Sequence, residues 1–309
     1  MAKEITHKTH YKQNLPDKIF MAVVYLTLIL TFLVTLYPLI FTVSASISDP
    51  SAVSSGEMIL WPVRVNFDGY KHLLGYKDIW VGYANTIFYT VAGTALNLLV
   101  TLPAAYALSR KDLKGRNFLM AIFVVTMYFS GGMIPGYLNM KSFHLLNTRA
   151  VMLISGLLSV YNMIVCRTFF ASSIPWELHE AACLDGASDA KTFTRVILPL
   201  SKPIMAVMTL YYGVTHWNAY FDAMIYLRDR DKYPLQMILR EILAESQGIV
   251  NVLSETTDTA TFQALMQQQD VANQLKYAVI IVATLPMMVA YPFLEKYFAK
   301  GVMIGSVKG

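Results

Sequence analysis

Residues 180–199 read EAACLDGASDAKTFTRVILP, and this polar stretch lies between two segments that are too apolar to face water. A glycine interrupts it at position 186 and a proline closes it at position 199. A charged segment held between two membrane-length apolar runs lies at a membrane surface, where it can contact a soluble partner. The stretch is therefore a candidate for coupling events in solution to events inside a membrane.

The apolar runs around it define the fold class. The chain has 309 residues, of which 55% are hydrophobic and only 15% charged, so it departs strongly from a soluble protein. Because a helix needs about 20 mainly apolar residues to cross a bilayer, each long run without Asp, Glu, Lys or Arg predicts one spanning helix. These runs are residues 19–48, 79–109, 117–140, 150–166, 203–221 and 277–294. The sequence thus predicts an all-α membrane protein with six transmembrane helices.

The distribution of Lys and Arg predicts the orientation of these helices. Basic residues gather in the N-terminal arm, in the short link after the second run and in the C-terminal tail. With six crossings, these segments share one side with residues 180–199, and that side is the cytoplasm. The expected organisation is a cytoplasmic arm at 1–18, a six-helix transmembrane domain at 19–298 with a cytoplasmic loop at 173–202 and an external loop at 228–276, and a cytoplasmic tail at 299–309. Since the basic residues flank membrane segments, membrane lipid and not nucleic acid is their expected partner.

The cytoplasmic loop is predicted to contain two short helices. Pro175 is placed to open the first helix, and Gly186 permits a tight or left-handed turn after it. Ser188 or Asp189 can cap the second helix, which Pro199 is expected to stop. The two helices therefore meet at Gly186.

The side chains of this helix pair suit docking to another protein. Ala181 and Ala182 are small enough for a partner surface to approach closely, and Glu180 and Asp185 offer carboxylate acceptors. The alternative is an amphipathic connector lying on the lipid headgroups, which has the same spacing. An interfacial helix favours Lys and Arg, however, whereas the first helix here carries acidic residues.

The same stretch resembles the EAA loop of binding-protein-dependent ABC importer permeases, whose pattern is EAA, three residues, Gly, nine residues, Ile, one residue and Leu-Pro. Val196 stands where the pattern has Ile. The resemblance implies the type I ABC importer permease fold and a coupling helix pair that fits a cleft on the ATP-hydrolysing subunit. The coupling residues that we infer from it are Glu180, Ala181, Ala182, Asp185, Gly186, Val196, Leu198 and Pro199.

Other stretches resemble the members of this family that take up carbohydrate. Trp217 and Asn218 resemble the Trp-Asn of the fifth span in sugar permeases, and the final KYFAKGVMIGSVKG resembles their tail. Residues 129–148 and 233–243 resemble the subgroup linked with oligosaccharide and polysaccharide uptake. The resemblance implies a multi-pass permease subunit of an ATP-driven importer in a bacterial cell membrane, forming half of an alternating-access pathway.

Partners and cofactors follow from the same resemblance and from one missing motif. No GxxxxGK[ST] phosphate loop occurs in the sequence, so we expect no cofactor on this chain and ATP with Mg on a partner ATPase. The implied partners are a second, different permease subunit, two ABC ATPase subunits and an extracellular or periplasmic sugar-binding protein. His179 and Cys183 lie one helical turn apart, but no second pair completes a metal site, so no metal or catalytic residue is predicted.

The predicted fifth span is the best candidate for the substrate pathway. It carries aromatic faces suited to sugar C–H surfaces beside groups that hydrogen-bond to hydroxyls, and Tyr211 and Asp222 belong to the same cluster. Tyr212, His216 and Tyr220 are spaced by four, so they are expected to share a helix face. The pathway residues that we predict are Tyr212, His216, Trp217, Asn218 and Tyr220. The alternative is that these side chains pack against neighbouring helices or anchor at the membrane interface.

Two other segments carry specific expectations. Gly131, Gly132 and Pro135 predict a kink or an early helix end in the third run. In the external loop, residues 234–244 suggest a short amphipathic helix that is followed by polar residues without clear periodicity. That loop either receives a solute-binding protein or is a flexible insertion.

Other classes of function receive less support from the sequence. A type I ABC permease for a non-sugar solute remains open. An intramembrane enzyme needs a nucleophile and a base buried together, and neither GxSxG nor HExxH is present. A secondary transporter calls for buried charges to bind its coupling ion, and the six runs carry none.

Overall fold

The structure of the protein is a computed structural model that describes residues 14–255 and 259–302. Every regular element within these residues is helical. The predicted all-α class is therefore confirmed. Most of the predicted N-terminal arm and C-terminal tail lies outside the described residues. The elements are α1 (Leu15–Ser46), α2 (Pro50–Ser54), α3 (Asp68–Gly75), α4 (Lys77–Ser109), α5 (Arg116–Tyr128), α6 (Met133–Ser142), α7 (Arg149–Ile154), α8 (Val160–Ser173), α9 (Glu177–Leu184), α10 (Asp189–Thr192), the π-helical turn η1 (Phe193–Ile197), α11 (Leu198–Leu200), α12 (Lys202–Trp217), α13 (Tyr220–Tyr226), the 3₁₀ turn η2 (Arg230–Lys232), α14 (Leu235–Glu255) and α15 (Thr259–Val302).

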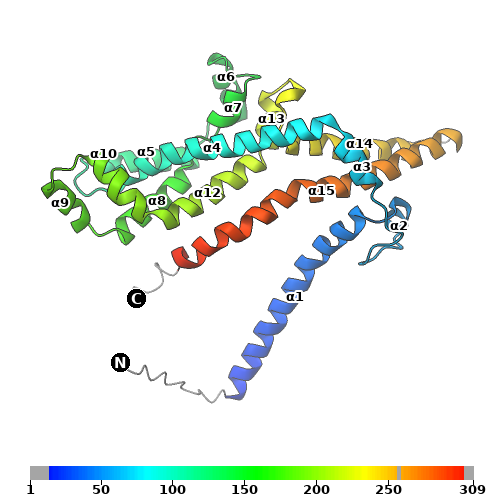
Figure 1. Ribbon diagram of the computed structural model, residues 1–309, viewed down its shortest axis with the longest axis horizontal. Coiled ribbons are helices and arrows are strands. Elements are labelled where there is room, and N and C mark those ends of the chain that lie inside the picture. The colour runs from blue at the N-terminus through cyan, green and yellow to red at the C-terminus, as the bar shows by residue number, and fades with distance from the viewer. Residues whose placement is uncertain (1–13, 256–258, 303–309) are drawn as a thin grey trace.

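The helices form an elongated molecule from which α1 is splayed away (Figure 1). α1 begins after Asn14, whose backbone N–H donates to Asp17 Oδ2 at 3.2 Å. Pro16 lies in its first turn, where a missing N–H costs nothing. The membrane-length apolar stretch of α1 is uncovered within the described chain. Lipid or another subunit must therefore cover that surface.

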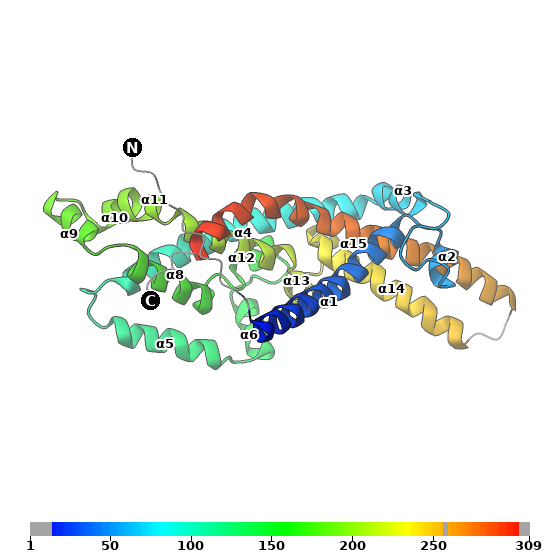
Figure 2. The same cartoon turned by 90° about the horizontal axis from the view of Figure 1, so that it is seen from below.

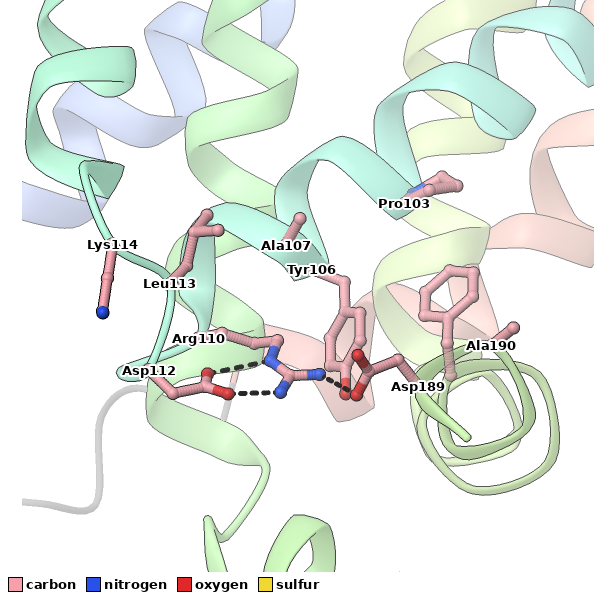
Figure 3. Close-up of a pocket in the computed structure, with 10 residues that line it drawn as sticks. Pro103, Tyr106, Ala107, Arg110, Asp112, Leu113, Lys114, Asp189 and Ala190 are labelled. Carbon is pink, nitrogen blue, oxygen red and sulfur yellow. Dashed lines mark hydrogen bonds and ion pairs between the residues drawn. The ribbon is translucent and has the colours of Figure 1, made fainter. Parts of the chain in front are cut away.

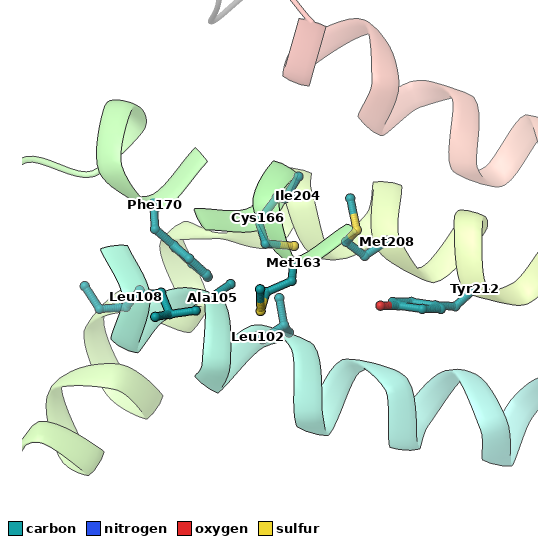
Figure 4. Close-up of a cluster of buried hydrophobic side chains, with 10 residues drawn as sticks. Leu102, Ala105, Leu108, Met163, Cys166, Phe170, Ile204, Met208 and Tyr212 are labelled. Carbon is teal, nitrogen blue, oxygen red and sulfur yellow. The ribbon is translucent and has the colours of Figure 1, made fainter. Parts of the chain in front are cut away.

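The main core joins α4, α8 and α12, which lie side by side (Figure 4). Leu102 and Ala105 of α4 meet Met163 of α8 and Met208 of α12, and all four are buried. Because these helices are apolar on the faces that meet, their packing holds the membrane part of the chain together. The ends of this core position the two candidate sites described below.

A second core lies toward the opposite end of the molecule. Ile79 of α4 packs there with Leu235 and Ile238 of α14 and with Val279 of α15. The two long helices α14 and α15 run along each other and extend beyond the rest of the chain (Figure 2). The predicted short helix at 234–244 is longer than expected, because α14 continues to Glu255, and the polar residues from 259 onward belong to α15. The two helices share the second core, which holds them together.

Several predicted membrane runs are interrupted. The third run ends its first helix at Tyr128 and bends by 113° before α6. Gly132 at this bend has φ of 87°, so the predicted kink is confirmed. The fourth run is divided by residues 155–159, which separate α7 from α8. A bend of 83° also separates α11 from α12.

The number of membrane crossings follows from helix length and composition. Within the described residues three helices are long and apolar enough to cross a membrane: α1, α4 and the Gln268–Pro292 part of α15. The count rises to five if the α5–α6 pair and the α10–α12 segment each form one bent span. The fourth predicted run is not among them because it is interrupted. Six crossings, and their orientation, therefore stay a prediction.

Candidate functional site

The loop predicted at 173–202 contains two short helices joined by a tight turn. The Ala187 N–H donates to the Ala182 carbonyl at 2.9 Å, which is the long bond of a Schellman motif. This motif needs a left-handed residue, and Gly186 supplies it with φ of 72°. Ser188 then caps α10 through its side-chain oxygen. The predicted turn and cap are thus confirmed.

The residues of the EAA motif divide between two faces of α9. Glu180 and Ala181 are exposed, whereas Ala182 is only 8% exposed and faces the rest of the chain. Leu184, the last residue of the helix, is 89% exposed, and Asp185 beside it is exposed as well. The outer surface of α9 therefore combines carboxylate acceptors with one projecting apolar side chain, which is a chemistry suited to a protein partner.

The second half of the loop packs more closely on the membrane core. Val196 and Leu198 contact the buried cluster of α4, α8 and α12, whereas Pro199 is exposed. The helix continues past Pro199 to Leu200, so the expectation that it stops at the proline is wrong by one residue. In the π-helical turn η1 the Leu198 N–H donates to the Phe193 carbonyl, and this altered register accommodates a residue that has no N–H.

An ion-pair network ties the loop to the end of α4 (Figure 3). Arg110 follows the last residue of α4, and its guanidinium binds Asp112 through two nitrogens and Asp189 of α10 through the third. The Arg110 side chain is only 15% exposed. Its hydrogen bonds hold the pKa of Asp112 at about 2, below the usual 3.8, because they stabilise the carboxylate. Arg110 therefore fixes the start of α10 against α4.

Tyr106, one turn earlier on α4, contacts both halves of the loop. Its ring stacks on Phe193 of η1 with 5.1 Å between centroids and meets Phe170 of α8 edge-on at 6.0 Å. Its hydroxyl lies 3.4 Å from Nδ1 of His179 on α9. The sequence reading did not single out Tyr106, and it used Arg110 only for orientation. No sequence pattern signals either role, because the contacts that reach the loop, from Tyr106 to His179 and from Arg110 to Asp189, join residues 73 and 79 positions apart.

Two potential metal ligands of the loop, His179 and Cys183, are neighbours on α9. Cys183 Sγ lies 3.6 Å from His179 Nε2, as their spacing on one helix predicts. Within residues 14–255 and 259–302, no group of three or more His, Cys, Asp and Glu side chains is arranged to hold a metal ion. The contact is a weak hydrogen bond inside the α9 turn.

A cavity of about 660 Å³ lies between the α7–α8 interruption and α12. Tyr212 and His216 of the predicted pathway line it, as do Tyr211 and Asp222 of the same cluster. The sequence reading missed the other polar lining residues, which are Ser155, Ser159, Tyr161, Asn162 and Thr215. Lys and Arg are absent from the lining that the structure describes. The cavity thus offers aromatic faces, hydroxyls and amides within the usual size of a ligand site.

The interrupted helix beside this cavity is held by side chains from two other helices. Asn97 of α4 is fully buried, and its Nδ2 donates to the carbonyls of Gly156 and Leu157 at 3.1 and 2.7 Å. Its Oδ1 accepts a hydrogen bond from His216 Nε2 at 2.7 Å. The Tyr212 hydroxyl accepts a hydrogen bond from the Ser159 N–H of the same link at 3.4 Å. These bonds satisfy the backbone groups that the missing helical turn leaves free.

The remaining predicted pathway residues lie elsewhere. Trp217 is buried, and its Nε1 donates to the Ala283 carbonyl of α15 at 3.1 Å. α12 ends at Trp217, so Tyr220 lies on α13 and does not share a helix face with Tyr212 and His216 as expected. Asn218 and Tyr220 line a separate cavity of about 420 Å³ against α14 and α15. The structure thus divides the predicted set between two cavities and one packing contact.

Comparisons with known proteins bear on the whole chain. No protein-family model matches it. The polygalacturonan/rhamnogalacturonan transport system permease protein YtcP of Bacillus subtilis (strain 168) is 37% identical over 293 residues, which are 95% of this chain and 99% of that protein. Protein LplC of the same organism is 39% identical over 277 residues, 89% of this chain and 90% of that protein.

A solved structure agrees with these relatives. One chain of a bacterial ABC transporter involved in the import of the acidic polysaccharide alginate superposes with a TM-score of 0.81 at 37% identity, covering 93% of this chain and 99% of that one. Identity at this level over nearly the full length of both chains extends the likeness from fold to family. The chain belongs to the carbohydrate-uptake ABC importer permeases, the multi-pass membrane subunits of bacterial binding-protein-dependent transporters, which are not themselves enzymes.

Proposed function

We propose that this permease forms half of an alternating-access pathway for an oligosaccharide and that residues 173–202 are its contact with an ATPase subunit. One observation carries the proposal: the loop that presents the exposed surface of α9 is held at the end of α4 by two side chains. Tyr106 and Arg110 join both halves of the loop to a helix that continues through the membrane core. A displacement applied to the loop therefore moves α4 with it, because a packed interface transmits motion as a unit.

The proposed coupling residues fall into an outer and an inner group. Glu180, Ala181 and Asp185 form the outer group together with Leu184, which only the structure reveals. Gly186 sets the turn between the two helices. The inner group consists of Ala182, Val196, Leu198 and Pro199. Ala182 is buried, Val196 and Leu198 pack against the core, and the exposed Pro199 follows them in the chain.

The arrangement of the ends supports the proposed topology of six crossings with both termini in the cytoplasm. The loop with α9 and α10 lies at one end of the elongated molecule, and the α14–α15 pair extends at the other (Figure 1). We assign the first end to the ATPases and the external loop at 228–276 to a sugar-binding protein. Two ATPase subunits would bind ATP and Mg, and a second, different permease would complete the pathway.

The substrate side of the proposal rests on the two cavities. Tyr212 and His216 are assigned to the cavity beside the α7–α8 interruption, and Asn218 and Tyr220 to the one beside α14, while Trp217 is fixed against α15. Aromatic faces beside hydroxyl and amide groups suit sugar rings. The polygalacturonan/rhamnogalacturonan and alginate systems named above favour a polysaccharide fragment.

The charge of the substrate is open to a direct test. Lys and Arg are absent from the described lining of the larger cavity, whereas Arg240 lines the smaller one, so we assign the recognition of any substrate carboxylate to Arg240 or to another subunit. The measurement is ATP turnover of the reconstituted assembly with its binding protein, across oligogalacturonates and neutral oligosaccharides of matched length. Stimulation by none of these sugars would refute the carbohydrate assignment.

The coupling role has a matched pair of variants. Gly186 and Gly56 have φ of 72° and 76°, both donate their N–H to a turn carbonyl, and neither has a neighbour near its missing Cβ. Proline at either position imposes the same change, because it requires φ near −65° and removes the N–H. We expect Gly186→Pro to abolish substrate-stimulated ATP hydrolysis and Gly56→Pro to leave most of it. Normal stimulation in Gly186→Pro, or equal loss in both variants, would refute a specific coupling role.

A further inference from the structure

A third cavity opens where α4 and α8 end and α9 begins. Its volume is about 630 Å³, and it is separate from the two cavities assigned to substrate. The link at 110–116, the last turn of α8 and the first turn of α9 surround it. The cationic side chains in its lining are Arg110, Lys111, Arg116 and Arg167.

The lining carries a strong excess of positive charge. Four cationic side chains face Glu177, which is the one carboxylate among the lining residues. Arg110 is neutralised by two aspartates that lie outside the cavity. The other three cations have no carboxylate oxygen within 4.0 Å among the residues that the structure describes. A concave surface of this kind attracts anions, because nearby charges of one sign add their fields.

Most of the hydrogen-bond donors in the cavity have no acceptor in the described part of the chain. Arg167 uses only Nε, which donates to the Leu108 carbonyl at 3.0 Å, so both terminal nitrogens of its guanidinium are unpaired there. Arg116 uses one terminal nitrogen, to the Arg110 carbonyl at 3.1 Å. The Lys111 ammonium lies 5.9 Å above a tryptophan ring and has no oxygen partner in these residues. Guanidinium forks with free nitrogens match the oxygens of phosphate.

We propose that this cavity binds a phosphate group, and that its source is the headgroup of an anionic phospholipid; the choice of the inner leaflet rests on the cytoplasmic position proposed above for residues 173–202. The position favours a lipid, since α4 is a membrane-length helix and the cavity lies at its end. Phe170, Ile174 and Ile197 give the cavity an apolar wall beside its cationic wall. A phospholipid presents both chemistries at the same depth, with its phosphate next to the start of its acyl chains.

Binding there would act on the loop. Trp176 precedes the first residue of α9 and His179 lies on the helix, and both line the same cavity as Arg167 of α8. A phosphate group bridging Arg167 and Lys111 would join the ends of α8 and α4, and it would hold the start of α9 there through the Trp176 ring, over which the Lys111 ammonium lies. The lipid would thus stabilise the position of the docking helix without contacting substrate.

The test uses the full chain purified in detergent together with its partner subunits. Binding of phosphatidylglycerol and of phosphatidylcholine is titrated and counted by native mass spectrometry. We expect tighter binding of phosphatidylglycerol, and a loss of about tenfold in that affinity for Arg167→Gln and for Lys111→Gln, because each removes a charged donor. Lys114→Gln is the matched control, since it removes the same charge from the same link outside this cavity.

A second arm separates the two sources of phosphate. Inorganic phosphate is titrated against the same variants by calorimetry in lipid-free detergent. Phosphatidylglycerol binding that falls in Arg167→Gln but not in Lys114→Gln supports the lipid source. Saturable phosphate binding with the same dependence, without a preference for phosphatidylglycerol, supports the site and identifies a free anion. Equal affinities for wild type, Arg167→Gln and Lys111→Gln in both arms would overturn the proposal. Because Lys111 is exposed, the Lys111→Gln variant keeps the test decisive if Arg167→Gln does not fold.

Discussion

Replacing Asn97 by leucine tests how the interrupted fourth segment is held. Leucine has the same number and branching of side-chain heavy atoms, so the change mainly removes three hydrogen bonds: two to the carbonyls of Gly156 and Leu157 and one from His216. Each is worth between about 0.6 kcal/mol, the mean for membrane helices, and about 1 kcal/mol. The expected loss in the free energy of unfolding is therefore about 2 to 3 kcal/mol.

The assay is unfolding of the purified chain in mixed micelles by titration with a denaturing detergent, followed by circular dichroism. Asn162→Leu is the matched control, because that side chain lines the cavity and makes no side-chain hydrogen bond in the described residues. It should change the free energy of unfolding by less than about 0.5 kcal/mol. If Asn97→Leu is equally mild, or if both variants lose the same amount, the buried amide does not hold the link.

Three further outcomes are expected. Gly93→Ala should destabilise the chain by about 1 to 3 kcal/mol, because its Cβ would lie 2.5 Å from the buried His216 ring, whereas Gly213→Ala, which meets nothing closer than 3.9 Å, should be tolerated in the same unfolding assay. Arg110→Gln should lower substrate-stimulated ATP turnover about fivefold, since it frees α10 from α4, while Lys114→Gln should not; equal turnover in the two variants would contradict the role of Arg110. The pKa of Asp112 is lowered to about 2, so its contribution is present above its ordinary 3.8 and is lost only as pH falls toward about 2. The ratio of turnover between wild type and Arg110→Gln should therefore be constant from about pH 5 to about pH 9. A ratio that varies across this range would show that a group other than Asp112 titrates in the ion-pair network around Arg110.

Local features were predictable from the sequence where local chemistry decides them. The turn at Gly186 and the cap at Ser188 depend on residues within one helical turn, and both are present as expected. The bend near Gly132 also follows from neighbouring residues, because glycine removes the penalty for a positive φ. The all-α class follows from the uncharged runs, which no soluble arrangement can bury.

Features that depend on distant residues were not predictable. The interruption at 155–159 contains no proline, and it is stable because Asn97 and Tyr212 supply hydrogen bonds from other helices. Spacing by four placed Tyr220 on the face of Tyr212, but the helix ends between them. The role of Arg110 depends on Asp189, which lies 79 residues further along the chain. In each case tertiary packing overrides or completes what the local pattern indicates.

The π-helical turn η1 adds one residue to the segment between the docking surface and the membrane core. A π turn holds one residue more than the α-helix that would replace it. Deleting one residue from Phe193–Ile197 would therefore turn this segment into regular α-helix and leave the phase of the residues beyond it nearly unchanged. Deleting a residue from the regular helix α12 instead would rotate everything beyond it by about 100° around the axis. The π turn thus gives the segment between the docking surface and the membrane core a tolerance in length that the regular helices lack.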